Sequence, residues 1–356
     1  EYKWLFPIQL LPSVVHFPFI SYLERIGVIF AMLMAKMERE NKTADNISFY
    51  DWLKKSHQSD RVIKRFWSVI VKPVFNDNLD NISAAMGLMF IKVGLMGKRG
   101  SANIFYPNVG LSDCIGGPSE DYLSGVGCEL HMGSSVDAIH IDDNQIVEVR
   151  LRNGNVLNSD IVVSALSYPN LVRVLNNSGI DMENISGDIS ELQSAGIMNV
   201  YLWYERPVME EKFCMVVDSP IESIFNRTAI ISSDHNSDEM MLDDDRYYCT
   251  VLSIGNAHDY MEWTHNEVIE FCTKEMVRIF DDPDLVTPVH AKIVKQHEAT
   301  IRCKPGSTGH RPDCMTSIQN LFIAGDWTRT GWPSTMEGAI RSGYNAARYI
   351  HDVYSA

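Results

Sequence analysis

The sequence is short of positive charge. Its 31 lysines and arginines stand against 46 aspartates and glutamates, a formal net charge of −15. Nucleic-acid binding needs a basic surface that meets phosphates, so this balance excludes nucleic acid as an expected partner. Hydrophobic residues make up 45% and charged residues 22% of the chain, which is typical of a globular protein. The 356 residues favour two domains, or one large domain with an insertion.

Paired cysteines and metal motifs are also missing. The seven cysteines include no C-x-x-C pair, and their odd number does not suit a disulfide framework. We therefore expect a reducing compartment and a cytoplasmic protein. His258, Glu262 and His265 have helical spacing, but without an H-E-x-x-H motif this pattern predicts a solvated surface, and no metal is expected.

Long apolar runs are absent as well. The longest, residues 26–35, has ten residues, whereas a bilayer span needs about 20. It lies within the hydrophobic segment 4–37 and predicts a buried core helix. The alternative is a helix that dips into a membrane interface or lines an entrance for an apolar substrate. The chain opens at Glu1 without Met, and we expect it to be a piece of a longer protein.

Periodicity divides the remaining chain into a helical first part and a later mixture of strands and helices. An Asn153-Gly154 turn between two alternating runs predicts a hairpin. The apolar run 161–166 predicts a strand buried on both faces, and the acidic segment 234–246 predicts a solvated loop. The expected helices are 51–55, 60–71, 83–93, 115–123 and 263–280; the expected strands are 129–131, 136–141, 146–151, 156–157, 160–166, 200–204, 214–217, 247–254, 289–298 and 321–324.

The C-terminal segment, residues 320–343, contains the residues with the clearest predicted chemical role. A short apolar strand, 321–324, stops at Gly325-Asp326, which puts a carboxylate at the carboxyl end of a strand, where α/β sheets bind ligands. A cofactor hydroxyl is a natural partner for it. After Pro333, the Ser334-x-x-Glu337 capping box predicts the start of a helix whose free N–H groups favour an anion. Apolar residues of that helix predict one packing stripe: Met336, Ile340, Gly343, Ala347 and Ile350.

This run resembles the C-terminal flavin signature of the amine oxidase and phytoene desaturase superfamily of FAD enzymes. Within that superfamily, residues 325–344 are most similar to the hydroxysqualene dehydroxylases, also called squalene-associated FAD-dependent desaturases. Further motifs follow in the family's order: Asp51-Trp52-Leu53, Gln58-Ser59, Phe66-Trp67, Asn78, Pro107 with Gly110-Leu111-Ser112, Pro305-Gly306 and Arg311-Pro312. The resemblance covers essentially the whole chain.

The resemblance implies an α/β fold with an α+β insertion. A Rossmann-like FAD-binding domain, incomplete at the N-terminus, would be interleaved with a sheet-plus-helix substrate domain. We expect a helical substrate-side region in residues 1–98, part of the FAD-binding domain in 99–175, the substrate domain in 176–304 and a C-terminal FAD-binding segment in 305–356.

The resemblance also implies FAD as the cofactor. Asp326 would bind the ribitol, Gly325 would allow close approach, and the first turn of the helix would face the N1 and C2 edge of the flavin, where a helix N-terminus stabilises negative charge. The backbone of Val136 would meet the adenine. The implied cofactor-binding residues are Val136, Gly325, Asp326, Thr335, Met336, Glu337, Gly338 and Ala339. No catalytic side chain is implied.

One departure from the superfamily matters. Its members begin with a strand, a G-x-G-x-x-G turn and a helix that hold the pyrophosphate, and no such unit is present. The turn Gly125-Val-Gly127 lacks the third glycine, and the glycines at 94, 97 and 100 have the wrong spacing. Either the sequence is a fragment of a longer gene, or it is a degenerate copy that binds FAD weakly or not at all.

By resemblance, the expected reaction is the reductive removal of the hydroxyl from hydroxysqualene, giving squalene for hopanoid or related triterpenoid synthesis. One alternative is a carotenoid (phytoene-type) desaturase, which moves hydride in the opposite direction, or another flavoenzyme of the superfamily. A second alternative is a non-catalytic truncated remnant. The expected ligand is a hydrophobic isoprenoid substrate, and the expected protein partners are enzymes of squalene synthesis. We also expect peripheral contact with a membrane, on its inner face.

Overall fold

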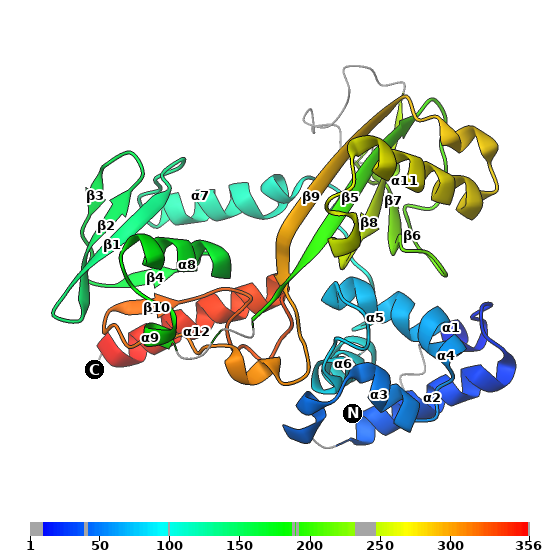
Figure 1. Ribbon diagram of the computed structural model, residues 1–356, viewed down its shortest axis with the longest axis horizontal. Helices are drawn as coiled ribbons and strands as arrows, with labels where there is room; N and C mark the ends of the chain where they lie inside the picture. Colours follow the sequence, from blue (N-terminus) through cyan, green and yellow to red (C-terminus); the bar gives the residue numbers. More distant parts are fainter. Residues whose placement is uncertain are drawn as a thin grey trace.

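The computed structural model describes residues 10–38, 42–98, 100–186, 189, 192–231 and 247–354. The chain forms two lobes joined by the long strands β5 and β9 (Figure 1). One lobe carries the C-terminal helix α12 (Met336–Tyr354), and the other carries the N-terminal helices beside a five-stranded sheet. The expected acidic loop at 234–246 lies outside the described residues.

The first part of the chain is a helical region. Its helices are α1 (Leu11–Val15), α2 (Tyr22–Met37), α3 (Phe49–Lys55), α4 (Asp60–Val62), α5 (Ser68–Phe75) and α6 (Ala84–Met89). Serine hydroxyls cap α2, α3, α4 and α6, as the helix-starting role of serine predicts. Wide π-helical turns at Ile63–Trp67 and Phe90–Leu95 continue two of these helices. The three predicted helices are therefore confirmed.

The predicted helix 60–71 extends further than expected, because α5 continues through Pro73 to Phe75. A proline inside a helix removes one backbone hydrogen bond, but Val71 and Phe75 on the same helix are buried in the core of the region. Their burial stabilises the extra turn.

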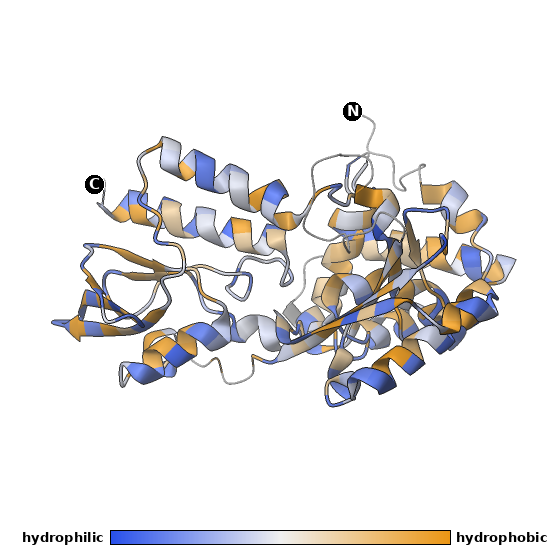
Figure 2. Ribbon diagram, turned by 90° about the horizontal axis from the view of Figure 1, so that it is seen from above, coloured by the Kyte–Doolittle hydropathy of each residue, from blue (hydrophilic) through white to orange (hydrophobic). Residues whose placement is uncertain are grey.

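The helix α2 has two apolar faces. Val28, Ala31, Met32 and Ala35 are buried on one face, so the predicted core helix is confirmed for that face only. The opposite face exposes large apolar side chains, among them Leu23, which is 80% exposed. Orange, hydrophobic residues recur along the helices of this lobe in Figure 2. Within the described residues, no helix combines the length and the hydropathy that crossing a bilayer demands.

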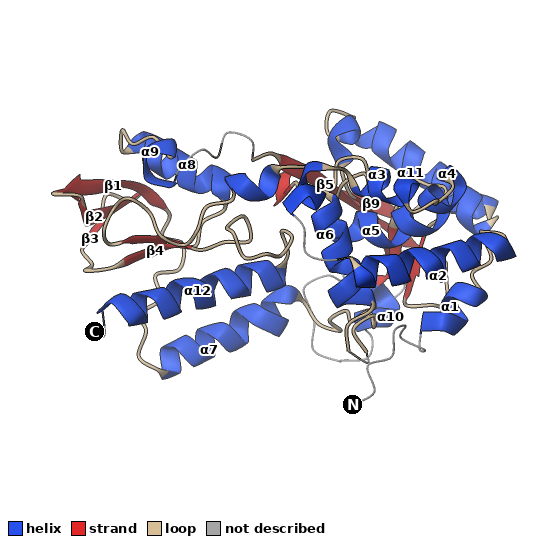
Figure 3. Cartoon of the chain, turned by 90° about the horizontal axis from the view of Figure 1, so that it is seen from below, coloured by secondary structure: helices blue, strands red, loops and turns tan. Residues whose placement is uncertain are grey.

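The five-stranded sheet has the order β6-β7-β8-β5-β9, and all neighbours are antiparallel. Its strands are β5 (Ser194–Tyr204), β6 (Phe213–Met215), β7 (Ser223–Asn226), β8 (Tyr248–Ile254) and β9 (His290–Ile301). The amphipathic helix α11 (His265–Phe280) buries Val268, Cys272 and Met276 in the same core as Val200, Leu202 and Leu252 of the sheet. In the view from below, the N-terminal helices lie in front of this sheet (Figure 3).

The other lobe contains two small sheets. An antiparallel sheet is formed by β1 (Val136–Asp142), β2 (Gln145–Leu151) and β3 (Val156–Leu157), and a parallel pair by β4 (Val162–Ser164) and β10 (Leu321–Ile323). The helices here are α7 (Gly117–Gly125), α8 (Tyr168–Asn177), α9 (Glu183–Ser186) and α12. The predicted Asn153-Gly154 turn is confirmed, and Gly154 has a φ of +89° that favours glycine.

Two strand predictions in this lobe are wrong. The run 161–166 is not buried on both faces, because Val163 is 46% exposed and Ala165, on the same face, is exposed too. Residues 129–131 form no strand in the described structure, since no neighbouring strand lies beside them to pair with. Continuous apolar character predicted burial, but burial also needs partners on both faces.

Candidate flavin site

The site is centred on the end of β10. The N–H of Ala324 donates to the carbonyl of Ser164 on β4, at 2.9 Å, and the N–H of Gly325 donates to the hydroxyl of Ser342 on α12, at 2.7 Å. Gly325 has a φ of +151°, and a Cβ there would lie 2.4 Å from Nε1 of Trp327. Trp327 is fully buried and donates from Nε1 to the carbonyl of Leu166. Only glycine therefore fits at 325.

Asp326 is half-buried just beyond this glycine. The hydroxyl of Ser334 donates to Oδ2 of Asp326, and the N–H of Ile301, at the end of β9, donates to the same hydroxyl, at 3.1 Å. These contacts hold the carboxylate against the loop that precedes α12. Asp326 keeps further acceptor positions, because an ionised carboxylate accepts about four hydrogen bonds.

The predicted capping box is wrong, because Ser334 is bound to Asp326 and does not cap the helix. Thr335 takes that place: its Oγ1 accepts from the N–H of Gly338, at 3.2 Å, and its carbonyl accepts from the N–H of Ala339. Glu337 binds Arg341 one turn later, at 2.8 Å. The helix α12 therefore begins at Met336, and its first turn still presents free N–H groups.

The predicted packing stripe of α12 is wrong too. Met336 is 63% exposed and Ile340 is also exposed, whereas the buried residues are Gly338, Ser342 and Ala346. Ser342 contacts the residue that follows this strand end, since its hydroxyl accepts from the N–H of Gly325. A Cβ added to Gly338 would lie 2.7 Å from the carbonyl oxygen of Pro333, so the loop before α12 can fold against the first turn only beside a glycine.

Arg311 is a site residue to which the sequence assigned no role. Its side chain is buried, and its Nη1 donates to the carbonyls of Trp332, at 2.7 Å, and Asp326, at 3.5 Å. Its Nη2 donates to Sγ of Cys303, at 3.5 Å. Burial raises the pKa of the Cys303 thiol, which keeps that sulfur neutral. Arg311 thus fixes the loop that carries Asp326, and the Arg311-Pro312 motif was the signal that could have found it.

A buried ion pair links this site to the helical region. Asp77, which follows α5, has a fully buried side chain and binds Arg302 through two hydrogen bonds, of 2.6 and 3.0 Å. Arg302 directly follows Ile301, whose N–H is held by Ser334. One contact chain therefore runs from the helical region through Arg302 and Ser334 to Asp326.

The other predicted residues fall in the same lobe or on the surface. Val136, the first residue of β1, is half-buried and packs against the cluster that contains Ile323 and Trp327. Its contact with adenine stays a prediction. His258, Glu262 and His265 are exposed, as expected. Among the described residues, no group of three or more His, Cys, Asp and Glu side chains has a metal-binding arrangement.

The groups around Asp326 fit one end of FAD. The hydroxyl oxygen of Ser164, at the end of β4, is buried and has no hydrogen-bond partner among the described residues. Apolar side chains in this lobe are uncovered, including Met336, Ile340 and Tyr344 of α12. Together with the N-terminus of α12, these groups suit a flat, partly anionic ring and a chain of hydroxyls. The sequence contains no G-x-G-x-x-G for the pyrophosphate.

The sequence profile of one family, described as flavin containing amine oxidoreductase, matches residues 6–351. This match spans nearly the entire chain and includes all the residues discussed above. The chain belongs to that family. The expected cofactor, FAD, and the expected superfamily are therefore confirmed. The contacts of FAD with Asp326, Gly325 and the first turn of α12 stay predictions.

The family's curated relatives include carotenoid enzymes. The 15-cis-phytoene desaturase of Glycine max is 25% identical over 334 residues, which cover 91% of this chain and 56% of that protein. The zeta-carotene desaturase of Arabidopsis thaliana is 24% identical over 335 residues, covering 88% and 59%. The chain thus spans less than two thirds of the length of these relatives.

Solved structures agree on the fold. An oxidoreductase from Methanosarcina mazei has a TM-score of 0.63 and 15% identity, covering 96% of this chain and 75% of that one. A putrescine oxidase has a TM-score of 0.64 and 11% identity, covering 95% and 77%. These likenesses confirm the predicted fold class, an α/β Rossmann-like FAD-binding fold of the flavin amine oxidoreductase family. The domain boundaries at 98, 175 and 304 stay a prediction.

Proposed function

We propose that this protein is an FAD-dependent oxidoreductase that acts on a long isoprenoid chain, and that its reaction is a desaturation of the carotenoid type. The observation that carries this proposal is the likeness to phytoene and zeta-carotene desaturases over about nine tenths of the chain.

The chain's own residues would bind and orient the cofactor. Asp326 would accept a hydrogen bond from a ribitol hydroxyl, with its carboxylate held by Ser334. The N-terminus of α12 would face the flavin edge that carries negative charge on reduction. FAD, when bound, supplies the hydride acceptor or donor. An apolar substrate needs no charged anchor, because each buried CH₂ contributes about 0.8 kcal/mol.

A second candidate is the reductive dehydroxylation of hydroxysqualene, in which hydride would move toward the substrate. It is supported by the likeness of residues 325–344 to the hydroxysqualene dehydroxylases. The two reactions differ in electron demand, since dehydroxylation consumes a reduced cofactor and releases water, whereas desaturation needs an oxidant.

Two steps test the proposal. The purified chain is incubated with FAD, the excess is removed, and the visible flavin absorption is measured. Retained flavin supports the assigned site, whereas a colourless protein favours the non-catalytic alternative for this chain. The loaded protein is then given phytoene with an electron acceptor, or hydroxysqualene with reduced flavin. A desaturated product supports the first reaction, squalene supports the second, and neither product from a flavin-loaded protein contradicts both.

We also propose that the exposed face of α2 contacts an anionic membrane surface, from which an isoprenoid substrate would be drawn. Its uncovered apolar side chains are Tyr22, Leu23, Ile26, Phe30 and Met37. Residues 1–98 contain 13 lysines and arginines against 9 aspartates and glutamates, whereas residues 99–356 contain 18 against 37. The positive charge is therefore concentrated in the first 98 residues, the part of the sequence that contains α2, which favours anionic lipid.

Vesicle sedimentation tests this contact. The protein should sediment with vesicles containing phosphatidylglycerol, and the double variant Leu23→Ser/Phe30→Ser should sediment far less. Equal sedimentation of the two proteins, or none with the wild type, would contradict the proposal. The cytoplasmic location and the partnership with enzymes of squalene synthesis stay predictions.

A further inference from the structure

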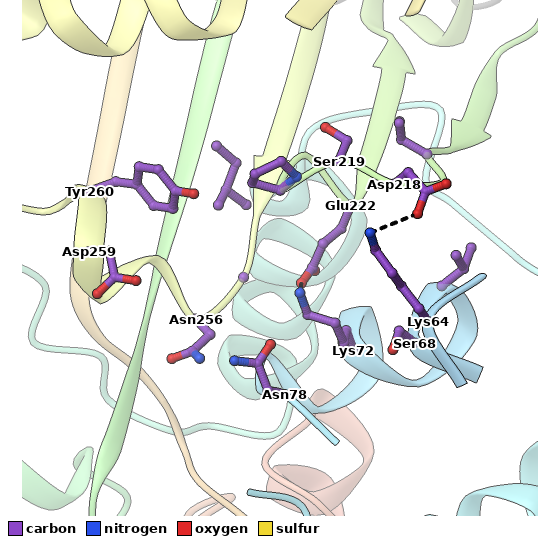
Figure 4. A pocket seen from close by; sticks show the side chains of 15 residues that line it. Lys64, Ser68, Lys72, Asn78, Asp218, Ser219, Glu222, Asn256, Asp259 and Tyr260 are labelled. Atoms are coloured by element: carbon purple, nitrogen blue, oxygen red, sulfur yellow. Dashed lines mark ion pairs between the residues drawn. The ribbon is translucent and has the colours of Figure 1, made fainter. Parts of the chain in front are cut away.

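A mostly polar cavity of about 460 Å³ separates the helical region from the end of the five-stranded sheet. The turn Ile63–Trp67 and α5 form one wall, and the segment between β6 and β7 and the end of β8 form the other (Figure 4). The buried residues of the helical region and those of the sheet and α11 form two separate cores in the described structure. Separating the two walls would therefore expose little apolar surface. We call this cavity the polar cleft.

Ion pairs join the two walls of the polar cleft. At its outer end, Lys64 and Arg65 bind the carboxylate of Asp218, at 3.1 and 2.8 Å, and the Asp218 side chain is 28% exposed. Figure 4 marks the first of these contacts. Further along α5, Nζ of Lys72 lies 3.7 Å from Oε1 of Glu222, whose side chain is only 6% exposed. The contacts between the walls therefore become drier along the helix.

The inner end of the polar cleft is firmly attached. There Asp77, next to the cleft-lining Asn78, has a fully buried side chain and binds Arg302 through two hydrogen bonds. The N–H of Ser83 donates to the carbonyl of Cys303, at 2.7 Å, and the Cys303 side chain belongs to the core of the helical region. Breaking a buried ion pair costs far more than breaking an exposed one, so any separation of the walls begins at the outer end and turns about Arg302.

The closed cleft has an energetic cost. Glu222 is only 7% exposed, and among the described residues no donor forms a hydrogen bond with its Oε1. Burying a carboxylate oxygen without a hydrogen bond is unfavourable, and opening the cleft would admit water to it. Glu222 therefore favours the open arrangement, whereas the contacts of Asp218 with Lys64 and Arg65 favour the closed one. A modest change at Asp218 can shift an equilibrium that is balanced in this way.

The outer end of the cleft lies beside the apolar surface of the N-terminal helices. Arg61, one turn before Arg65, donates from Nη2 to the carbonyl of Phe19, at 3.4 Å, and Phe19 is 46% exposed. Phe19 directly precedes the helix α2, whose exposed face we propose as the membrane contact. Arg61, Lys64, Arg65 and Asp218 also line one shallow surface hollow. Lipid phosphates bind arginine and lysine as carboxylates do, so an anionic membrane at Phe19 competes with Asp218 for these cations.

We propose that the helical region is a lid on the five-stranded sheet, hinged at Asp77 and Arg302 and latched by the contacts of Asp218 with Lys64 and Arg65. An anionic membrane opens the lid, because its phosphates take the two cations from Asp218. The inference rests on the proposed function for the isoprenoid substrate and for the membrane contact. The lid keeps the two parts together in water and separates them only at the membrane, where an apolar substrate is found.

Chemical labelling of Lys72 measures the opening. Its amine faces the polar cleft and its side chain is 24% exposed, so an amine-acetylating reagent should modify it faster when the cleft opens. Lys274, an exposed lysine on α11, is the internal reference, and peptide mass spectrometry gives both rates. Phosphatidylglycerol vesicles should raise the rate at Lys72 relative to Lys274 about fivefold over phosphatidylcholine vesicles, the effect expected when partly exposed ion pairs are lost. Equal relative rates with the two kinds of vesicle would overturn the proposal.

The variant Asp218→Asn tests the latch. Asparagine removes the charge and tolerates the left-handed backbone of this residue, whose φ is +57°, and thermal unfolding checks the fold. Without any lipid, this variant should label Lys72 about fivefold faster than the wild type does, and phosphatidylglycerol should add little. Asp284→Asn removes the same charge from an exposed pair with Arg206 and should label as the wild type does. Slow labelling of Asp218→Asn, or equally fast labelling of Asp284→Asn, would contradict the latch.

The outcome is separate from those of the proposed function. Flavin retention and product formation do not depend on how fast Lys72 is labelled, and vesicle sedimentation reports the membrane contact whether or not the lid opens. A wild type that sediments with phosphatidylglycerol vesicles but keeps slow labelling at Lys72 would therefore reject the lid alone. A wild type that does not sediment would reject the membrane contact and, with it, the opening of the lid by a membrane.

Discussion

The buried ion pair between Asp77 and Arg302 makes the contribution of the helical region to the site measurable. The Asp77 side chain is fully buried, and that of Arg302 is 16% exposed. Asp77 also accepts from the N–H of Asn78, at 2.8 Å, and from the side chain of Asn81, at 3.2 Å. Substituting Asp77→Ala leaves the Arg302 charge without its partner in a mostly dry environment.

Removing one partner of a buried pair costs about 3–5 kcal/mol, so we expect Asp77→Ala to lower the free energy of unfolding by that amount. Urea unfolding at neutral pH, followed by tryptophan fluorescence, measures it, since Trp52 and Trp67 lie in the core of the helical region. The double variant Asp77→Leu/Arg302→Met removes both charges and should recover most of the loss.

Salt and a surface pair supply the controls. The loss should change little between low and high salt, because buried pairs are weakly screened. Lys274→Ala breaks an exposed pair with Glu270 on α11 and should have almost no effect. A loss below about 1 kcal/mol for Asp77→Ala, the range of exposed pairs, would refute the view that this pair holds the helical region to the site.

Three other predictions concern single residues. Asp326→Ala should lower the affinity for FAD about tenfold, since a carboxylate acceptor is lost, as measured by flavin retained after gel filtration. Gly87→Ala should cost about 1–3 kcal/mol in urea unfolding, because its Cβ would lie 2.3 Å from the ring of Phe49. Burial raises the pKa of Glu222, so its contribution to stability is complete below the ordinary value of 4.5 and is lost as pH rises through the raised pKa. Between pH 4.5 and the raised pKa of Glu222, the wild type should therefore lose unfolding free energy relative to Glu222→Gln.

Each of these has a contradicting result. Unchanged flavin content in Asp326→Ala would reject its role at the ribitol. Gly125→Ala, where a Cβ meets nothing within 4 Å, is the matched control for Gly87→Ala, and equal stability of the two variants would show that the contact with Phe49 relaxes freely. A stability difference for Glu222→Gln that stays constant with pH would show that Glu222 titrates normally.

Sequence reasoning succeeded where local chemistry decides the structure. Apolar residues at helical spacing predicted the helices of the first part of the chain, and Asn153-Gly154 predicted a hairpin, because these patterns depend on residues close in sequence. Gly325 and Asp326 were singled out because the carboxyl end of a strand is where α/β sheets bind ligands, and the resemblance to the flavin signature implied their role at the cofactor. The structure confirms the strand end, and the family match confirms the cofactor class.

Sequence reasoning failed where a side chain's contacts come from residues far apart in the chain. Ser334 has the spacing of a helix cap, but Ile301 and Asp326, which the fold brings beside it, use its hydroxyl instead. Met336 and Ile340 of the predicted apolar stripe of α12 are exposed, because the helix buries its other side, through Gly338, Ser342 and Ala346. The burial of residues 161–166 failed for a similar reason, since apolar character does not say which neighbours are present.

The sequence by itself therefore predicted the family and the cofactor, through the resemblance of the C-terminal run to a flavin signature, and the family match confirms both. The contacts of the strand-end residues with FAD stay predictions. Only the tertiary structure decided which groups meet across the chain. It joined Asp77 to Arg302, fixed the loop of Asp326 with Arg311, and left Glu222 beside Lys72 in a cavity. The Asp77–Arg302 and Lys72–Glu222 contacts join residues more than 100 positions apart, and the Arg311 contact spans a loop and a strand, so all three depend on the packing of whole elements and no local pattern encodes them.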